Sequence, residues 1–145
     1  MKFREILRRE RVRRWLRFGA VGATGFLIEA SLITLLVHGL GWGPYQARMI
    51  SFPIAVSVTW YLNRTFTFAD LAGGCRKREY GRYVLVNTVG AGTNLSVYAI
   101  AVALSGQIAR WPVLGLVLGA GAGMFINYLG ARHFAFRPDR QEVEA

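Results

Sequence analysis

Four long apolar stretches occupy most of this 145-residue chain. They cover residues 18–38, 44–62, 83–105 and 112–131. Each stretch approaches the roughly 20 residues that a helix needs to cross a bilayer. Backbone groups in lipid must be satisfied within the protein, and these stretches are too long and continuous for barrel strands. We therefore predict an all-α polytopic membrane protein with four transmembrane helices.

Composition agrees with a membrane class and excludes several others. Hydrophobic residues make up 53% of the chain and charged residues only 18%, which is too apolar for an ordinary soluble domain. The net charge is +10, but the basic residues sit between the apolar stretches. Nucleic-acid binding would need them to share one folded polar surface, so this function is not favoured. The single cysteine, Cys75, excludes an internal disulfide and a structural zinc site.

The distribution of Lys and Arg predicts the orientation, because positive residues are retained on the cytoplasmic side. Only Arg48, near the outer end of the second stretch, and Arg110 fall on the side assigned to the outside. We expect both termini and the middle connection, residues 63–82, in the cytoplasm. The predicted organisation is a basic segment over residues 1–17, a membrane domain over 18–137 and a cytoplasmic tail over 138–145. The residues assigned to the inside are Lys2, Arg4, Arg8, Arg9, Arg11, Arg13, Arg14, Arg17, Arg64, Arg76, Lys77, Arg78, Arg82, Arg132, Arg137 and Arg140.

The basic segment allows two further interpretations. Arg13 and Arg14 before an apolar run resemble a twin-arginine or secretory signal, but the run is too long, contains Glu29 and precedes three more stretches. Phe3, Ile6 and Leu7 would suit a short interfacial helix on anionic lipid. A solvated topology determinant is an equal alternative.

The chain also resembles itself. At an offset of 65 residues, Phe18 aligns with Tyr83, Gly25 with Gly90 and Glu29 with Asn94; at an offset of 68, Pro44 aligns with Pro112, Arg64 with Arg132, Phe66 with Phe134 and Phe68 with Phe136. This pattern predicts a duplicated two-helix hairpin. Since each copy crosses twice, the two copies enter from the same side and are parallel.

Small residues recur at every fourth position in the second helix of each copy. The positions are Ala47, Ser51, Ala55, Thr59 and Asn63 in one, and Gly115, Gly119, Gly123, Asn127 and Ala131 in the other. Such a face allows close helix approach. It could join the two repeats or two subunits. Pro53 is expected to kink its helix, with Ser51 or a neighbouring helix compensating the freed carbonyl.

These motifs together resemble the GtrA-like family of small bacterial membrane proteins. The signatures are Arg17, Phe18, Val21 and Gly22, then Pro44 and Ala47, then Asn63, Arg64, Phe66 and Phe68. A weaker second copy runs from Arg82 and Tyr83 through Asn94 and Asn127 to Arg132, Phe134 and Phe136. The similarity covers about residues 14–137.

The resemblance implies movement of a polyprenyl-phosphate-linked sugar across the bacterial cytoplasmic membrane for modification of cell-surface polysaccharide. It also implies a glycosyltransferase as a partner. Two positions depart from the family pattern. Glu29 stands where a neutral polar residue is common, and Asn87 replaces the glycine of the repeat.

Glu29 is the main candidate for a mechanistic role, because it lies near the middle of the first stretch. An ionised carboxylate there costs at least a few kcal/mol, so we expect it to be protonated, paired or facing water. It could couple protons or bind sugar hydroxyls, or it could have the structural role of bonding to Asn94 or Ser51. Asn94 and Asn87 share a face of the third stretch and could line the same polar site or bond between helices.

The remaining substrate-binding candidates lie near helix ends. Arginine suits phosphate binding, but anionic lipid would also occupy such residues. Arg48 could receive the phosphate at the outer leaflet or extend to the interface. The candidates are Arg17, Arg82, Arg64, Arg132 and Arg48, together with Asn63 and Asn127 of the family motifs.

The sequence contains no nucleophile and base pair, metal cluster or cofactor motif, so we predict no catalysis and no cofactor. Four helices are few for sheltering a sugar headgroup, so we expect a homodimer or larger oligomer. Two other functions remain open: a non-transporting anchor for a glycosyltransferase, and an exporter of the small multidrug resistance kind. The fixed orientation and parallel repeat count against the exporter.

Overall fold

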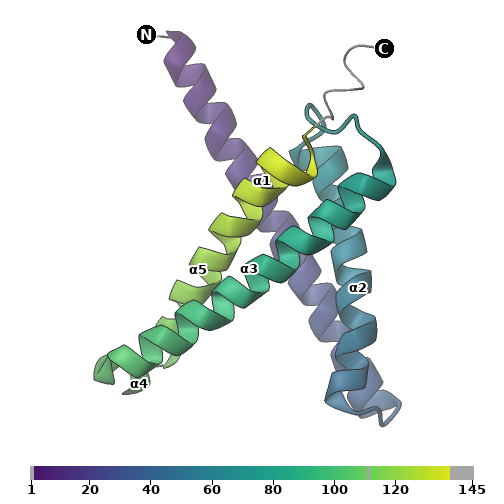
Figure 1. Cartoon of the computed structure of the whole chain (residues 1–145), viewed down its shortest axis with the longest axis vertical. Coiled ribbons are helices and arrows are strands. Elements are labelled where there is room, and N and C mark those ends of the chain that lie inside the picture. The colour runs from purple at the N-terminus through teal and green to yellow at the C-terminus, as the bar shows by residue number, and fades with distance from the viewer. Residues whose placement is uncertain (1, 111, 138–145) are drawn as a thin grey trace. The chain divides into compact units, whose positions relative to one another are not determined.

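The computed structural model describes residues 2–110 and 112–137, with no side-chain description for residues 2–8, 109, 112 and 113. The predicted tail over 138–145 and the side chains of Phe3, Ile6 and Leu7 lie outside the described part. The chain divides into two compact units, Met1–Ala72 and Gly73–Ala145. All regular secondary structure in the described residues is helical. Each unit is a helical hairpin (Figure 1).

The first hairpin pairs α1 (Lys2–Thr34) with α2 (Pro44–Leu62). Wide π-helical turns extend both helices, η1 (Leu35–Gly39) after α1 and η2 (Asn63–Thr67) after α2. No Pro or Gly interrupts the chain before Gly19, so the basic segment forms no separate short helix and continues directly into the apolar helix. The bounds predicted for the second stretch agree with those of α2.

A tight turn joins α1 to α2. Gly41 adopts a positive φ of 68°, a conformation that suits glycine. The backbone N–H of Gly43 donates to Oε1 of Gln46 at 3.2 Å, and Pro44 occupies the start of α2, where a missing N–H costs nothing. These local features end one helix and begin the next within a few residues.

The second hairpin consists of α3 (Arg76–Leu104), a short α4 (Gly106–Arg110), α5 (Pro112–Gly130) and the wide turn η3 (Ala131–Ala135). The irregular segment before α3 is shorter than the predicted connection over residues 63–82. Helical structure continues through η2 to Thr67 and resumes at Arg76. The predicted connection after the third stretch contains α4.

Three helical stretches among the described residues are long and apolar enough to cross a membrane: Arg9–Gly39, Arg76–Leu104 and Leu114–Ala135. The helix α2 forms as expected but is not one of these three. It is less apolar because Gln46, Arg48 and several Ser and Thr residues lie along it. The count of four membrane spans stays a prediction.

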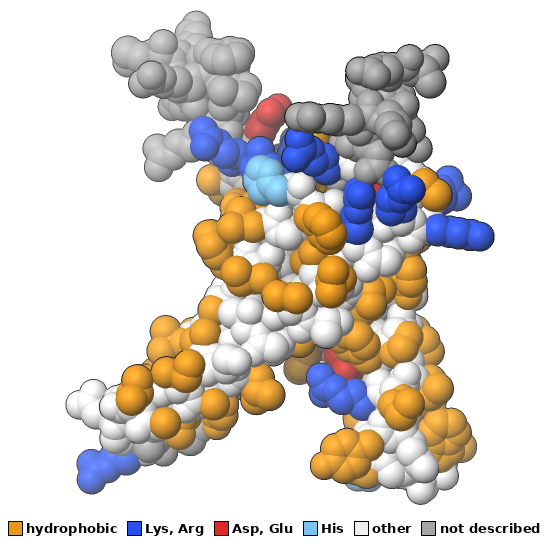
Figure 2. Space-filling view, viewed as in Figure 1, with side chains coloured by type: hydrophobic (Ala, Val, Ile, Leu, Met, Phe, Trp, Pro, Cys, Tyr) orange, Lys and Arg blue, Asp and Glu red, His pale blue; other side chains and the backbone are white. Residues whose placement is uncertain are grey.

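Side chains are distributed as in a protein surrounded by lipid. Large apolar residues such as Phe26, Leu95 and Val117 are exposed, whereas small and polar ones such as Ser51 and Asn63 are buried. Figure 2 shows hydrophobic side chains along the exposed lengths of the helices. This arrangement fits helices that associate through close packing and polar contacts rather than through burial of large apolar groups.

Hydroxyl groups on the helices bond to the backbone of the preceding turn. Thr24 donates to the Ala20 carbonyl at 3.0 Å, and Thr93 donates to that of Val89 at 3.0 Å. Ser57 likewise donates to the Pro53 carbonyl at 2.7 Å. The expectation that Ser51 compensates the carbonyl freed by Pro53 is wrong, because the buried Oγ of Ser51 makes no hydrogen bond. A hydroxyl four residues after a carbonyl is well placed to reach it.

The small-residue faces pack within each hairpin. In the first, a Cβ on Gly25 of α1 would overlap the Thr59 side chain of α2. In the second, a Cβ on Gly123 of α5 would lie 2.8 Å from the Gly90 carbonyl oxygen of α3. We expected these faces to join repeats or subunits, but these contacts join the two helices of one hairpin, because glycine and small side chains permit close antiparallel approach.

Candidate functional site

The first hairpin places a carboxylate and a guanidinium together along its apolar length. Oε1 of Glu29 on α1 lies 3.8 Å from Nη2 of Arg48 on α2. The Glu29 side chain is 21% exposed and that of Arg48 is 64% exposed. Oε1 is buried and makes no hydrogen bond, so the contact is a loose ion pair. The arginine therefore keeps N–H donors available for another anion.

Sequence reasoning identified both members of this pair but missed that they meet. It assigned Arg48 to the outer interface, and it assigned Ser51 or Asn94 as structural partners of Glu29. Ser51 faces the hairpin interior without a hydrogen bond, and Asn94 belongs to the other unit. The short turn between α1 and α2 was the available signal, because an arginine side chain is long enough to reach about one helical turn along an antiparallel neighbour.

In the second hairpin the candidate amides lie at close helix contacts. The Asn127 side chain occupies the space beside Gly90, and Asn94 lies against Gly119 and Gly123. Nδ2 of Asn87 donates to the Tyr83 carbonyl at 2.9 Å, within its own helix. These amides fill space left by glycines or bond locally, which is a packing role.

The candidate arginines at the helix ends include two on the wide turns and two with contacts to phenylalanine residues. Arg64 and Arg132 lie half-buried on the wide turns η2 and η3, and Asn63 at the start of η2 is fully buried. Arg17 donates from Nη1 to the Phe66 carbonyl at 3.1 Å. The guanidinium carbon of Arg82 lies 5.4 Å from the centre of the Phe134 ring, a cation–π contact.

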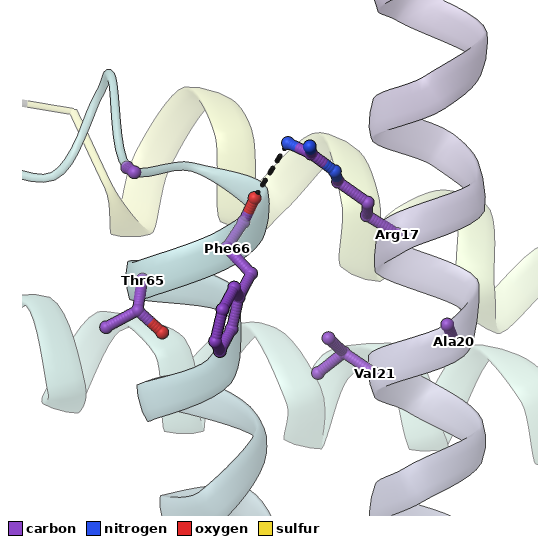
Figure 3. Close-up of a pocket in the computed structure, with 6 residues that line it drawn as sticks. Arg17, Ala20, Val21, Thr65 and Phe66 are labelled. Carbon is purple, nitrogen blue, oxygen red and sulfur yellow. Dashed lines mark hydrogen bonds between the residues drawn. The ribbon is translucent and has the colours of Figure 1, made fainter.

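A cavity of about 450 Å³ opens beside Arg17. Its walls come from α1, η2 and the residue after the Phe66 to Phe68 motif, and Figure 3 shows Arg17 reaching from α1 to the Phe66 carbonyl. Pockets for small ligands are commonly of this size and mostly apolar with few polar groups. The lining residues are Arg17, Ala20, Val21, Thr65, Phe66 and Ala69.

One buried carboxylate was missed from the sequence. Glu79, in the first turn of α3, is 2% exposed, and its Oε1 accepts a hydrogen bond from the Gly74 backbone N–H at 3.1 Å. An acidic residue in the first turn of a helix is favoured by the helix dipole, which was the available signal. Its role here is to fix the segment that leads into α3.

Comparison with protein families identifies the domain. Residues 17–136 match the GtrA/DPMS transmembrane domain. The chain belongs to this family. The GtrA-like assignment made from the sequence is therefore confirmed. No match to a curated protein was found.

Membership of the GtrA/DPMS family, together with three apolar helices, makes the chain a multi-pass membrane protein. It also indicates a role in the handling of lipid-linked sugars.

The GtrA/DPMS domain of this chain has matching contacts in its two hairpins. Phe18 and Phe68 meet edge to face with ring centres 6.0 Å apart, and Tyr83 and Phe136, at the aligned positions, lie 5.7 Å apart. The turns η2 and η3 also align, and each ends with a bond back across the wide turn, from Phe68 N–H to the Asn63 carbonyl and from Phe136 N–H to that of Ala131.

The Glu29 and Arg48 pair of the GtrA/DPMS domain does not follow the same match. Position 29 is Glu and the aligned position 94 is Asn, while Arg48 aligns with Leu116. The positions of the second hairpin that align with Glu29 and Arg48 therefore carry no counterpart of this ion pair.

Proposed function

We propose that this protein moves a polyprenyl-phosphate-linked sugar from the cytoplasmic to the outer leaflet of the bacterial cytoplasmic membrane. The observation that carries the proposal is the loose Glu29 and Arg48 pair in the first hairpin. Charged residues within membrane helices are costly and are retained for function. Family membership supplies the substrate class, a lipid-linked sugar.

The pair suits a phosphate group that must cross an apolar layer. Arginine binds phosphate through several N–H donors, and a contact of 3.8 Å without a hydrogen bond is easily exchanged. In the proposed step, the substrate phosphate takes the place of Glu29 beside Arg48, and the carboxylate takes the arginine back when the phosphate leaves. The alternation keeps the arginine from being left without an anion in lipid.

Several further features belong to this proposal. The helices cross four times as two parallel hairpins, with both termini in the cytoplasm, as the Lys and Arg distribution favours. Oligomerisation and the absence of catalysis are parts of the same proposal.

A membrane anchor for a glycosyltransferase is the second candidate. It is favoured by the exposed basic side chains Arg76, Lys77 and Arg78 at the start of α3, which could contact an acidic partner surface. This function requires neither Glu29 nor Arg48, so the two candidates differ in what they predict for these residues.

The test is leaflet-to-leaflet movement of a short-chain polyprenyl-phosphate sugar in proteoliposomes. Glu29→Gln and Arg48→Gln are each expected to lower the rate about tenfold or more. The controls make the same charge changes elsewhere: Glu10→Gln on the exposed part of α1, and Arg110→Gln at the end of α4. The controls should keep the rate of the unaltered protein.

Equal loss in the controls would assign the effect to net charge and overturn the role of the pair. Background movement with well-folded unaltered protein would favour the anchor. In that case a glycosyltransferase should co-purify with Glu29→Gln but not with a chain in which Arg76, Lys77 and Arg78 are replaced by Gln.

A further inference from the structure

The cavity beside Arg17 lies at the end of the first hairpin where basic residues gather. On the predicted orientation this is the cytoplasmic end, where a lipid-linked sugar would enter. Its walls are apolar apart from one guanidinium and the Thr65 hydroxyl, which already donates to the Tyr61 carbonyl at 2.8 Å. The cavity therefore combines one cation with a surface suited to hydrocarbon.

The charge of Arg17 is not neutralised by the contact that orients it. Its Nη1 donates to the backbone carbonyl of Phe66, which lies in the last helical turn and would otherwise lack a helical donor. A carbonyl is neutral, so the guanidinium keeps its charge and its other N–H donors. The bond fixes the position of the arginine at the edge of the cavity, as Figure 3 shows.

The neighbouring charges are already paired with each other. Asp70 follows the cavity residue Ala69 and would repel an anion if it were free. Its Oδ2 instead lies 2.8 Å from Nη2 of Arg14. That ion pair removes Asp70 as a competitor and leaves Arg17 as the cation that lines the cavity.

We infer that the Arg17 cavity holds the phosphate and the first isoprenyl units of a polyprenyl phosphate lipid before it crosses. The phosphate bonds the free N–H donors of Arg17, and the hydrocarbon lies along Val21 and the Phe66 ring. The ligand class rests on the proposed function, whereas the site rests on the cavity and its single cation. Arg17 is a binding residue here.

The experiment measures binding of farnesyl phosphate to the full chain in zwitterionic nanodiscs by calorimetry. We expect Arg17→Gln to weaken binding about tenfold or more, because the variant loses a charge-assisted contact with the phosphate. Ala20→Phe keeps the charge and fills the cavity, so it should weaken binding similarly. Arg110→Gln removes one positive charge from an exposed position at the end of α4 and should leave binding unchanged.

The inference would be overturned by unchanged binding in Ala20→Phe or by equal weakening in Arg110→Gln. Full competition by inorganic phosphate at the concentration of the lipid would also overturn it, because this would mean an anion site without a role for the hydrocarbon. Competition by phosphatidylglycerol at equal concentration would overturn it too, because the site would then accept any anionic headgroup. Should Arg17→Gln fail to fold, Ala20→Phe decides the question alone.

Separate measurements of farnesyl phosphate binding and of sugar-lipid movement distinguish a failure of this inference from a failure of the proposed function. Loss of farnesyl phosphate binding in Ala20→Phe with undiminished sugar-lipid movement would overturn the entry site alone. Binding at the cavity with no movement by folded protein would overturn the transport function alone.

Discussion

Glu29 and Arg48 form an ion pair between the two helices of the first hairpin, with Oε1 3.8 Å from Nη2. The aligned residues of the second hairpin are Asn94 and Leu116, which carry no charge. The hairpins therefore match in their aromatic contacts and wide turns but differ in charge. This difference makes the first hairpin the better candidate for contact with a phosphate.

The Glu29 and Arg48 contact should contribute only modestly to stability, because it is loose and Arg48 is largely exposed. In a double-mutant cycle with Glu29→Gln and Arg48→Gln, we expect a coupling free energy of about 0.5–1.5 kcal/mol. Reversible unfolding of the full chain in micelles gives the value. Strictly additive effects would show that the two side chains do not interact.

Close contact between α3 and α5 should depend on particular glycines. A Cβ on Gly119 would lie 2.6 Å from the Asn94 carbonyl oxygen, so Gly119→Ala should cost about 1–3 kcal/mol of unfolding free energy. Gly121 has nothing within 4 Å of such an atom, so Gly121→Ala should be neutral or stabilise by up to about 1 kcal/mol. Unfolding in micelles compares the two variants, and a similar cost at both positions would contradict the helix contact.

The turn between α1 and α2 should require a residue that tolerates a positive φ. Gly41 has a φ of 68°, so Gly41→Ala should lower the free energy of unfolding by about 1–2 kcal/mol. Gly41→Asn should recover part of this loss, because asparagine visits the left-handed region more readily. Thermal unfolding of the two variants tests whether position 41 needs a positive φ. Equal stability of Gly41→Ala and Gly41→Asn would contradict this requirement.

Chemical labelling can test the predicted orientation. Cys75 is exposed in the segment between η2 and α3, which the Lys and Arg distribution assigns to the cytoplasm. A membrane-impermeant maleimide should therefore label it only after cells are permeabilised. Leu40→Cys in a Cys75→Ser background lies in the turn assigned to the outside and should be labelled in intact cells. The reverse pattern would invert the orientation.

The comparison of sequence and structure shows that helix positions were predictable. Bilayer thickness sets the length of an apolar stretch, and Pro44 and the glycines around it mark a helix boundary in the sequence itself. The aromatic motif also predicted equivalent ends for the two hairpins. The wide turn over Asn63–Thr67 was not predicted, because π-helical turns are rare and these residues do not distinguish one from a continued α-helix.

What the sequence by itself determined was local or periodic: the membrane class, the helices, the small-residue faces and the family. The tertiary structure alone decided which residues meet. It placed Arg48 beside Glu29, directed the small faces into their own hairpins, and placed Arg17 at the edge of a cavity. The physical reason is that a helix repeat fixes the face on which a residue lies, whereas its partner depends on how far one helix is shifted along another and on where long side chains reach.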